Sequence, residues 1–261
     1  GRAAFFPSDE TYRTHGGISV RRIIEDIPVD NAVEPIIDAL DSRRGVLLAS
    51  SYEYPGRYTR WDMGFIDPPL SLVSRGRRFQ FSALNQRGQV LLPAIADAVC
   101  HLPAVVESEV QAGEISGLIA LPEGRFPEEQ RSKQPSIFSV LRAVIELFAS
   151  PDDQHLGFYG AFGYDLAFQF EPLRLRLERP ADQRDLLLYI PDQLVLVDHR
   201  REQAVRHRYD FEVNGASTQG LPREGASQGY VGADQVERAC DHEPGEYAAG
   251  VRRAREAFKR G

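Results

Sequence analysis

The sequence predicts an α+β fold of mostly antiparallel sheets with packed helices. Short apolar runs bounded by Gly, Pro or Asn recur along the chain, which is typical of strands. Several successive runs are joined by short turns, so they are expected to pair as hairpins. A few longer segments place apolar residues every three or four positions, which is the period of an amphipathic helix.

The composition is that of an ordinary globular protein. The 261 residues carry a formal net charge of −7 with both signs scattered along the chain, so neither nucleic acid nor a membrane surface is expected as a partner. No apolar run approaches the roughly 20 residues that span a bilayer. The six histidines share no ligand spacing, and Cys100 and Cys240 show none either. We therefore expect a cytoplasmic protein whose own residues hold no metal.

Residues 46–62 read as a hairpin with a polar tip. Val46–Ala49 is a short apolar run preceded by a glycine, which fits a buried strand. Ser50 and Ser51 follow, and a Pro-Gly turn then leads into an aromatic second arm. Such a tip offers hydroxyls for an ammonium, guanidinium groups for a carboxylate and aromatic walls for a side chain, as a free amino acid needs. An ordinary hairpin with a solvated tip is the alternative, and the spacing leaves both open.

Three helices are expected within the body of the chain. The first is capped by Asp30 or Asn31 and ends at Gly45. Its expected apolar face consists of Val33, Ile36, Ile37 and Leu40. A second helix is expected over 90–102, after a turn at 85–88, and a third starts at Ser136 and stops before Pro151.

Residues 156–172 combine glycines with aromatic residues. Gly157, Gly160 and Gly163 recur at every third position, unlike the dinucleotide-binding fingerprint. We expect a strand whose glycines allow another backbone to approach closely, followed by a helical turn. Asp165 in that turn is expected to be a structural hydrogen-bonding residue rather than a catalyst.

The remaining segments complete the predicted fold. Strands are expected over 18–24, 70–74, 77–84, 185–190, 193–198 and 204–211. Residues 214–245 are rich in Gly, Ser, Gln and charge, which is typical of a flexible linker. Residues 246–260 form an amphipathic helix with one apolar stripe, typical of the first element of a further domain.

These stretches together resemble the chorismate-utilising enzymes, specifically the N-terminal half of anthranilate synthase component I in its fused bacterial form. Residues 50–62 resemble the family's Leu-Glu-Ser element and the Arg-Tyr-Ser strand that follows it. Residues 157–172 resemble its Gly-Tyr-x-x-Tyr-Asp stretch ending in Phe-Glu, and 185–199 resemble its Pro-Asp and Asp-His strands. Residues 245–247 open a helix similar to the one that begins the family's catalytic half.

The resemblance implies a domain organisation and an effector site. Residues 1–213 would form a regulatory domain that binds tryptophan, 214–245 a linker, and 246–261 the first helix of a catalytic domain that this sequence does not contain. The implied tryptophan-binding residues are Ser50, Ser51, Arg57 and Tyr58. Many family members carry Glu where this chain has Ala49, so the ammonium group would be bound by Ser50, by backbone carbonyls or by another acid.

The implied reaction is a lyase reaction that depends on Mg²⁺. Ammonia, supplied from glutamine by a fused or separate glutamine amidotransferase, adds to chorismate, and elimination of pyruvate gives anthranilate. Because the family's catalytic and magnesium-binding motifs do not occur in these 261 residues, no catalytic residue and no metal ligand is assigned here. Whether the parent enzyme forms a homodimer is left open.

Two alternatives remain open. A sibling enzyme that makes aminodeoxychorismate or a phenazine precursor would share the same motifs. A stand-alone amino-acid-binding module would share the serine element but have no catalytic partner.

Overall fold

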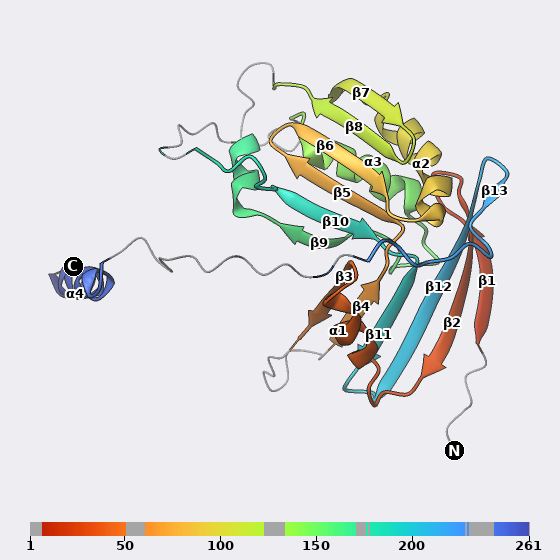
Figure 1. Ribbon diagram of the computed structural model, residues 1–261, viewed down its shortest axis with the longest axis horizontal. Helices are drawn as coiled ribbons and strands as arrows, with labels where there is room; N and C mark the ends of the chain where they lie inside the picture. Colours follow the sequence, from red (N-terminus) through yellow and green to blue (C-terminus); the bar gives the residue numbers. More distant parts are fainter. Residues whose placement is uncertain are drawn as a thin grey trace. The chain divides into compact units, whose positions relative to one another are not determined.

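The computed structural model describes residues 7–50, 61–122, 134–170, 176, 178–227, 229 and 243–260. These residues belong to two units, one within residues 1–229 and the other within 230–261. The larger unit consists of two antiparallel sheets with helices packed on them (Figure 1). This architecture confirms the predicted α+β fold.

The first sheet has seven strands in the order β1-β2-β12-β11-β4-β3, with β13 paired to β12. Its strands are β1 (Ser8–Arg13), β2 (Ser19–Ile27), β3 (Gly45–Ala49), β4 (Trp61–Ile66), β11 (Gln193–Asp198), β12 (Gln203–Val213) and β13 (Ala216–Ser217). The second sheet has six strands in the order β7-β8-β6-β5-β10-β9. Its strands are β5 (Leu70–Arg75), β6 (Arg78–Ala83), β7 (Val105–Gln111), β8 (Glu114–Ile119), β9 (Tyr159–Phe162) and β10 (Leu186–Ile190). Strands β1, β7, β8 and β13 have no counterpart in the sequence-based prediction.

Two chain segments pass from one sheet into the other, and they pair with each other in both sheets. Strand β4 leads into β5 and β10 leads into β11, while β4 pairs with β11 and β5 pairs with β10. The bends between them contain Asp67, Pro68 and Pro69 on one segment and Pro191 and Asp192 on the other. Asp67 takes a positive φ of 49°, and the prolines supply no ladder N–H, so pairing is interrupted at this corner.

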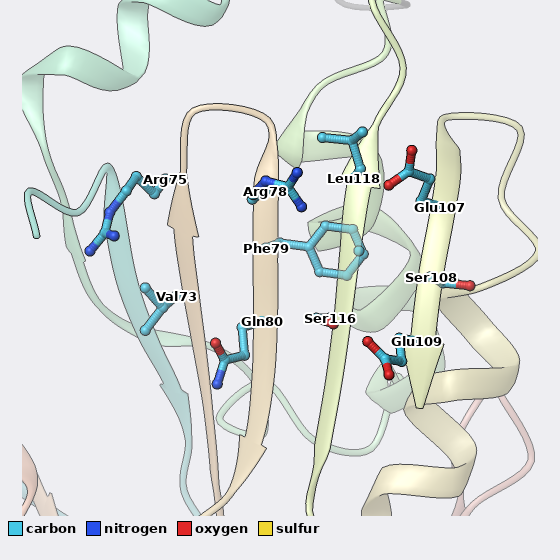
Figure 2. Close-up of a pocket in the computed structure, with 11 residues that line it drawn as sticks. Val73, Arg75, Arg78, Phe79, Gln80, Glu107, Ser108, Glu109, Ser116 and Leu118 are labelled. Carbon is cyan, nitrogen blue, oxygen red and sulfur yellow. The ribbon is translucent and has the colours of Figure 1, made fainter. Parts of the chain in front are cut away.

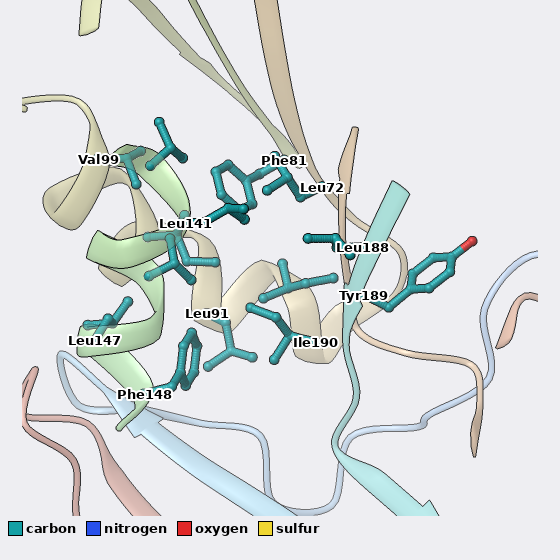
Figure 3. Packing of buried hydrophobic residues seen from close by; sticks show 14 of the residues in the cluster. Leu72, Phe81, Leu91, Val99, Leu141, Leu147, Phe148, Leu188, Tyr189 and Ile190 are labelled. Carbon is teal, nitrogen blue, oxygen red and sulfur yellow. The ribbon is translucent and has the colours of Figure 1, made fainter. Parts of the chain in front are cut away.

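The main core lies where α2 (Gln86–Val99) and α3 (Ile137–Phe148) pack on the six-stranded sheet (Figure 3). Every second residue of a strand points to this side, as in Leu70 and Leu72 of β5 or Phe79 and Phe81 of β6. Residues of β2, β4, β11 and β12 join the same cluster. The helices therefore fill the space that both sheets border.

Helix α1 (Glu34–Leu40) covers the other face of the seven-stranded sheet, where Ile36 packs with Val195 and Val197. The predicted cap is wrong. Val33 is the N-cap residue, and Asn31 lies in the preceding turn with a positive φ of 59°. The helix starts later, with a proline in its first turn. Ile37 also differs from the prediction, because it is 48% exposed.

Helix α2 begins at Gln86, earlier than the predicted start at residue 90. Asn85 is its N-cap, and its Oδ1 accepts a hydrogen bond from Gly88 N at 3.0 Å. Gly88 suggested a turn, but it lies inside the helix. This position requires glycine because a Cβ there would stand 2.0 Å from Pro69 O. The glycine thus serves close packing of α2 on the corner of the sheets.

The predicted linker begins too early at residue 214. Strand β13 pairs with β12, and Thr218 is fully buried. Thr218 Oγ1 accepts a hydrogen bond from Phe211 N at 2.9 Å. The small polar residues of this segment pack through backbone hydrogen bonds, which composition does not reveal. Residues 214–225 are therefore part of the folded unit.

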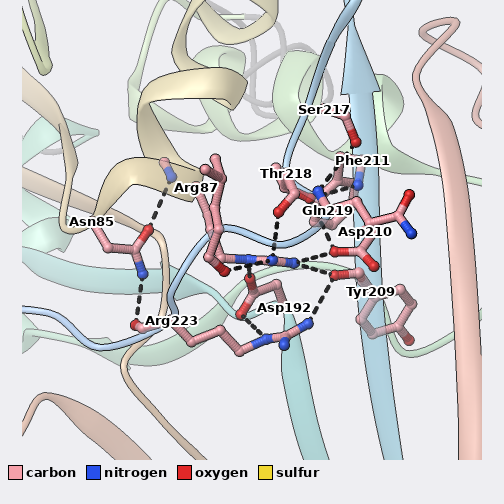
Figure 4. A network of polar contacts seen from close by, with 12 residues as sticks. Asn85, Arg87, Asp192, Tyr209, Asp210, Phe211, Ser217, Thr218, Gln219 and Arg223 are labelled. Carbon is pink, nitrogen blue, oxygen red and sulfur yellow. Dashed lines mark hydrogen bonds and ion pairs between the residues drawn. The ribbon is translucent and has the colours of Figure 1, made fainter.

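A buried arginine near the start of α2 connects residues 214–225 to the corner of the two sheets (Figure 4). Arg87 is 1% exposed, and its Nε donates to the buried carboxylate of Asp192. Its Nη1 donates to Thr218 O at 2.7 Å and Leu221 O at 3.3 Å. Its Nη2 donates to Tyr209 O at 2.6 Å and to Asp210 Oδ1 at 2.8 Å.

Replacing this arginine tests its structural role. Arg87→Ala leaves the buried Asp192 carboxylate without its closest cation and several buried carbonyls without donors, so we expect a loss of about 3–5 kcal/mol in the free energy of unfolding, measured by urea denaturation. Arg21→Ala is the control, since Arg21 pairs with Asp9 on the surface, where solvent screens the pair, and we expect a much smaller loss. Similar losses in the two variants would contradict the assignment.

The glycine-rich stretch forms β9 and the 3₁₀ helix η2 (Tyr164–Gln169). Gly160 of β9 faces Leu188 of β10, and a Cβ at Gly160 would stand 2.1 Å from Leu187 O. The predicted close backbone approach is confirmed at this position. Asp165 accepts a hydrogen bond from Gln183 Nε2 at 2.6 Å and lies 3.0 Å from Arg179 Nε, which fits its predicted hydrogen-bonding role.

The close approach gives a second prediction. Gly160→Ala should push β9 away from β10 and lower the free energy of unfolding by about 1–3 kcal/mol, as measured by chemical denaturation. Gly157→Ala provides the control from the same stretch, because a Cβ there would meet nothing within 4 Å. If both variants were equally stable, the close approach would not constrain the strand.

The smaller unit contains the predicted terminal helix, α4 (Glu246–Arg260). Tyr247, Val251 and Phe258 of its apolar stripe are exposed. The acidic Glu246 in its first turn and the basic Lys259 and Arg260 in its last turn complement the helix dipole.

Candidate effector site

The predicted hairpin is present as the antiparallel pair β3 and β4, in which Ala49 faces Asp62. Ser50 extends this pairing by one residue, since its N donates to Trp61 O at 3.1 Å. Ser50 is half-buried at the end of β3. The other predicted effector residues, Ser51, Arg57 and Tyr58, lie outside the described residues. Ser50 is thus the predicted site residue whose position is defined.

Ser50, Trp61 and Asp198 form a row across three neighbouring strands. Trp61 is the backbone partner of Ser50 on one side and faces Asp198 of β11 on the other. Residues directly opposite each other in an antiparallel sheet project to the same face. The row therefore places a hydroxyl, an indole and a carboxylate on one face, at the end of the sheet.

A hollow of about 480 Å³ lies at this end and is lined by Trp61, Asp198, Arg200 and Arg201. Trp61 is 44% exposed, whereas Asp198 is 5% exposed. The Asp198 Oδ1 accepts hydrogen bonds from the backbone N of Arg200 at 3.0 Å and of Arg201 at 3.1 Å. These bonds close the turn between β11 and β12 and fix the carboxylate. The hollow thus combines an aromatic surface with both signs of charge.

The opposite face of the same strands is closed by an acid–histidine pair. Asp62 is the neighbour of Trp61, and its Oδ2 lies 2.6 Å from His199 Nε2. The side chain of Asp62 is nearly buried. This pair connects β4 to the β11–β12 turn and holds the two strand ends together beneath the hollow.

The sequence analysis missed Asp198 and Arg200 as candidate site residues. It placed a strand over 193–198 and a turn after it, so the local structure was predicted. The pairing of β11 with β4 carries no local signal, because these strands lie far apart in the sequence. Without that pairing nothing connects Asp198 with Ser50.

A second hollow, of about 450 Å³, lies on the outer face of the six-stranded sheet (Figure 2). Arg78 and Glu107 both face Leu118, on neighbouring strands. Arg75 and Glu109 also line the hollow. The two signs of charge balance here, and Ser50, the predicted effector residue within the described ranges, does not line this surface. We therefore do not regard it as the effector site.

A buried polar cluster joins β1, β2 and β12 to the loop before β9. Tyr12 Oη donates to Asp153 Oδ2 at 2.9 Å, and Arg22 Nη1 lies 3.3 Å from the same oxygen. Burial acts to raise the pKa of Asp153, but the hydrogen bonds from His155 N, Tyr209 and Tyr12 and the charge of Arg22 outweigh it and lower the pKa. The internal partners identify this cluster as structural.

His207 belongs to the same cluster and lies in T-shaped contact with His155, their ring centroids 5.1 Å apart. Burial, together with repulsion from His155, lowers the pKa of His207 to about 4. Burial also raises the pKa of Tyr159, to about 12. The folded state thus holds both groups in their neutral forms at neutral pH.

Among the described residues, no three His, Cys, Asp or Glu side chains are grouped so that they could hold a metal ion. Within the same ranges, no helix is both long enough and apolar enough to cross a membrane.

The architecture defines the class of this protein as an α+β domain in which two antiparallel sheets share a corner. No family model matches the chain. Anthranilate synthase of Azospirillum brasilense is 50% identical over 250 residues, which cover 96% of this chain and 34% of that protein. Anthranilate synthase component 1 of Vibrio cholerae is 28% identical over 178 residues, covering 67% of this chain and 33% of that protein.

Anthranilate synthase component 1 of Serratia marcescens is 28% identical over 250 residues, covering 84% of this chain and 44% of that protein. The chain belongs to the anthranilate synthase family, as its motifs predict. It spans about a third of the length of the Azospirillum protein.

The depressed pKa of His207 predicts acid sensitivity. In the unfolded chain His207 is protonated below about pH 6.5, whereas in the folded state it is protonated only below about pH 4. The free energy of unfolding should therefore fall as the pH is lowered through this window. The contribution of His207 to this fall is up to about 3 kcal/mol. Asp153 acts at lower pH, because its contribution is lost only below its ordinary pKa of 3.8.

Urea denaturation at a series of pH values measures this effect. His207→Gln should flatten the fall between pH 6.5 and pH 4, whereas His101→Gln, at an exposed position, should leave it unchanged. A slope that survives in the His207 variant would assign the acid sensitivity to another group.

Proposed function

We propose that this chain is the regulatory part of an anthranilate synthase and holds the site at which tryptophan inhibits the enzyme. The observation that carries the proposal is the 50% identity to an anthranilate synthase over 96% of the chain. Two features support the location of the site. Ser50 directly follows β3, the edge strand of the seven-stranded sheet, and its backbone partner Trp61 lines a hollow that also has a charged lining.

The reaction we propose for the complete enzyme joins ammonia, derived from glutamine by an amidotransferase, to chorismate and releases pyruvate and anthranilate. Magnesium would neutralise the charge of the substrate in that reaction. The described residues offer no grouped ligands for this ion, so we derive no step through it. We assign the chemistry to the part of the relatives that this chain does not span.

Regulation then requires a coupling free energy between two sites. Tryptophan must bind more tightly to the less active arrangement of the enzyme than to the active one. By linkage, chorismate bound at the active site must weaken tryptophan binding by the same factor. The role of the present domain is to supply contacts for tryptophan that differ between the two arrangements.

Ser50 provides the test in the complete enzyme. Ser50→Phe places a large side chain beside Trp61, so we expect loss of tryptophan inhibition with an unchanged kcat, measured by anthranilate formation at increasing tryptophan concentration. The control is Ser108→Phe, at an exposed position on β7, which should leave inhibition intact. Unchanged inhibition in the Ser50 variant would remove this serine from the site. A product other than anthranilate would instead identify a sibling enzyme.

A further inference from the structure

The end of the sheet beside Ser50 contains the two kinds of charge that a free amino acid requires. Asp198 supplies a carboxylate, and Arg200 and Arg201 follow it in the turn. Trp61 lies between Asp198 and Ser50 in the row across the strands. Neighbouring strands are about 4.8 Å apart, so Ser50 and Asp198 are separated by two such spacings, or about 10 Å. An amino acid with an aromatic side chain fits this span.

We propose that this hollow binds the α-amino and α-carboxylate groups of the amino-acid effector, an inference that rests on the proposed function. Asp198 accepts hydrogen bonds from the ammonium, and Arg200 donates to the carboxylate. The indole of Trp61 is the surface on which the effector's side chain lies. Ser50 closes the site at the far end of the row.

Within the described residues, one carboxylate oxygen of Asp198 accepts no hydrogen bond. Its Oδ1 is occupied by the two backbone N–H groups of the turn. Its Oδ2 lies 3.8 Å from Arg201 Nε, which is beyond hydrogen-bond distance. A carboxylate that is almost fully buried is stabilised by a close cation, and the ammonium of an amino acid supplies one. The turn also fixes the carboxylate before the ligand arrives, which lowers the entropic cost of binding.

The neighbouring strands offer no comparable acid. Strand β3, which leads to Ser50, carries no acidic residue, and Ala49 stands directly before the serine. Asp62 of β4 projects to the opposite face, where it is paired with His199. Within the described part of this sheet end, Asp198 is thus the carboxylate that faces the hollow.

Arg200 is suited to the carboxylate of the effector. Its backbone N is held by Asp198, while its side chain is exposed and makes no ion pair with the described residues. Arg201 differs, since its guanidinium is the one directed at Asp198. A planar guanidinium can bind a carboxylate with two parallel hydrogen bonds.

Titration calorimetry on the full-length protein tests the assignment with three probes. L-Tryptophan carries both charged groups, indole-3-propionate lacks the ammonium, and tryptamine lacks the carboxylate. Asp198→Asn keeps the Oδ1 acceptor of the turn but removes the charge. We expect this variant to bind L-tryptophan and tryptamine about 10- to 100-fold more weakly. Its affinity for indole-3-propionate should be unchanged. Arg200→Gln should lower the affinity for L-tryptophan and indole-3-propionate and leave the affinity for tryptamine unchanged.

Because Arg200 is exposed, its replacement is not expected to disturb folding. The matched control is Arg78→Gln, on the outer face of the six-stranded sheet, which should bind all three probes normally. Wild-type affinity for L-tryptophan in both the Asp198 and the Arg200 variant would overturn this inference while leaving the proposed function intact. An equal loss for all three probes would also overturn it, because the charges would then not be recognised individually. Failure of the unaltered protein to bind L-tryptophan would overturn the proposed function and this inference with it.

Discussion

The folded unit depends on the buried guanidinium of Arg87. A guanidinium has five N–H donors, and each of the five acceptors around Arg87 belongs to the corner of the sheets or to the chain that crosses it. Asp192 comes from the bend between β10 and β11, Tyr209 and Asp210 come from β12, and two carbonyls come from the segment after β13. A charge this deeply buried is tolerated because its hydrogen bonds are complete.

The corner that Arg87 holds also determines what meets at the far end of the seven-stranded sheet. Because β4 and β11 remain paired from the corner outward, their ends arrive side by side. One end carries Trp61 and, through β3, Ser50. The other carries Asp198 and the turn to β12. The candidate effector site is therefore a consequence of the sheet topology and does not arise within one hairpin.

Local patterns predicted most elements of this fold, and the failures have physical causes. The β3–β4 hairpin and α3 follow from apolar runs and their boundaries. The start of α2 was misplaced because Gly88 is typical of a turn, although here the glycine is required by the close approach of Pro69 O. Residues 214–225 resemble a linker because their main partners are backbone groups, such as the Thr218 carbonyl that accepts from Arg87. Side-chain composition contains no information on such contacts.

The candidate site shows the same division between local and non-local information. Ser50 was predicted because the serine element and its hairpin are contiguous in sequence. Asp198, the acid that faces the hollow, was not predicted as a site residue, because it lies beside Trp61 only through the pairing of two strands that are distant in sequence. A ligand held by both would stabilise the relative position of β3 and β11. Such a ligand can shift an equilibrium only by its difference in affinity between two arrangements. The distance between these strand ends is therefore the variable through which we expect an effector to act.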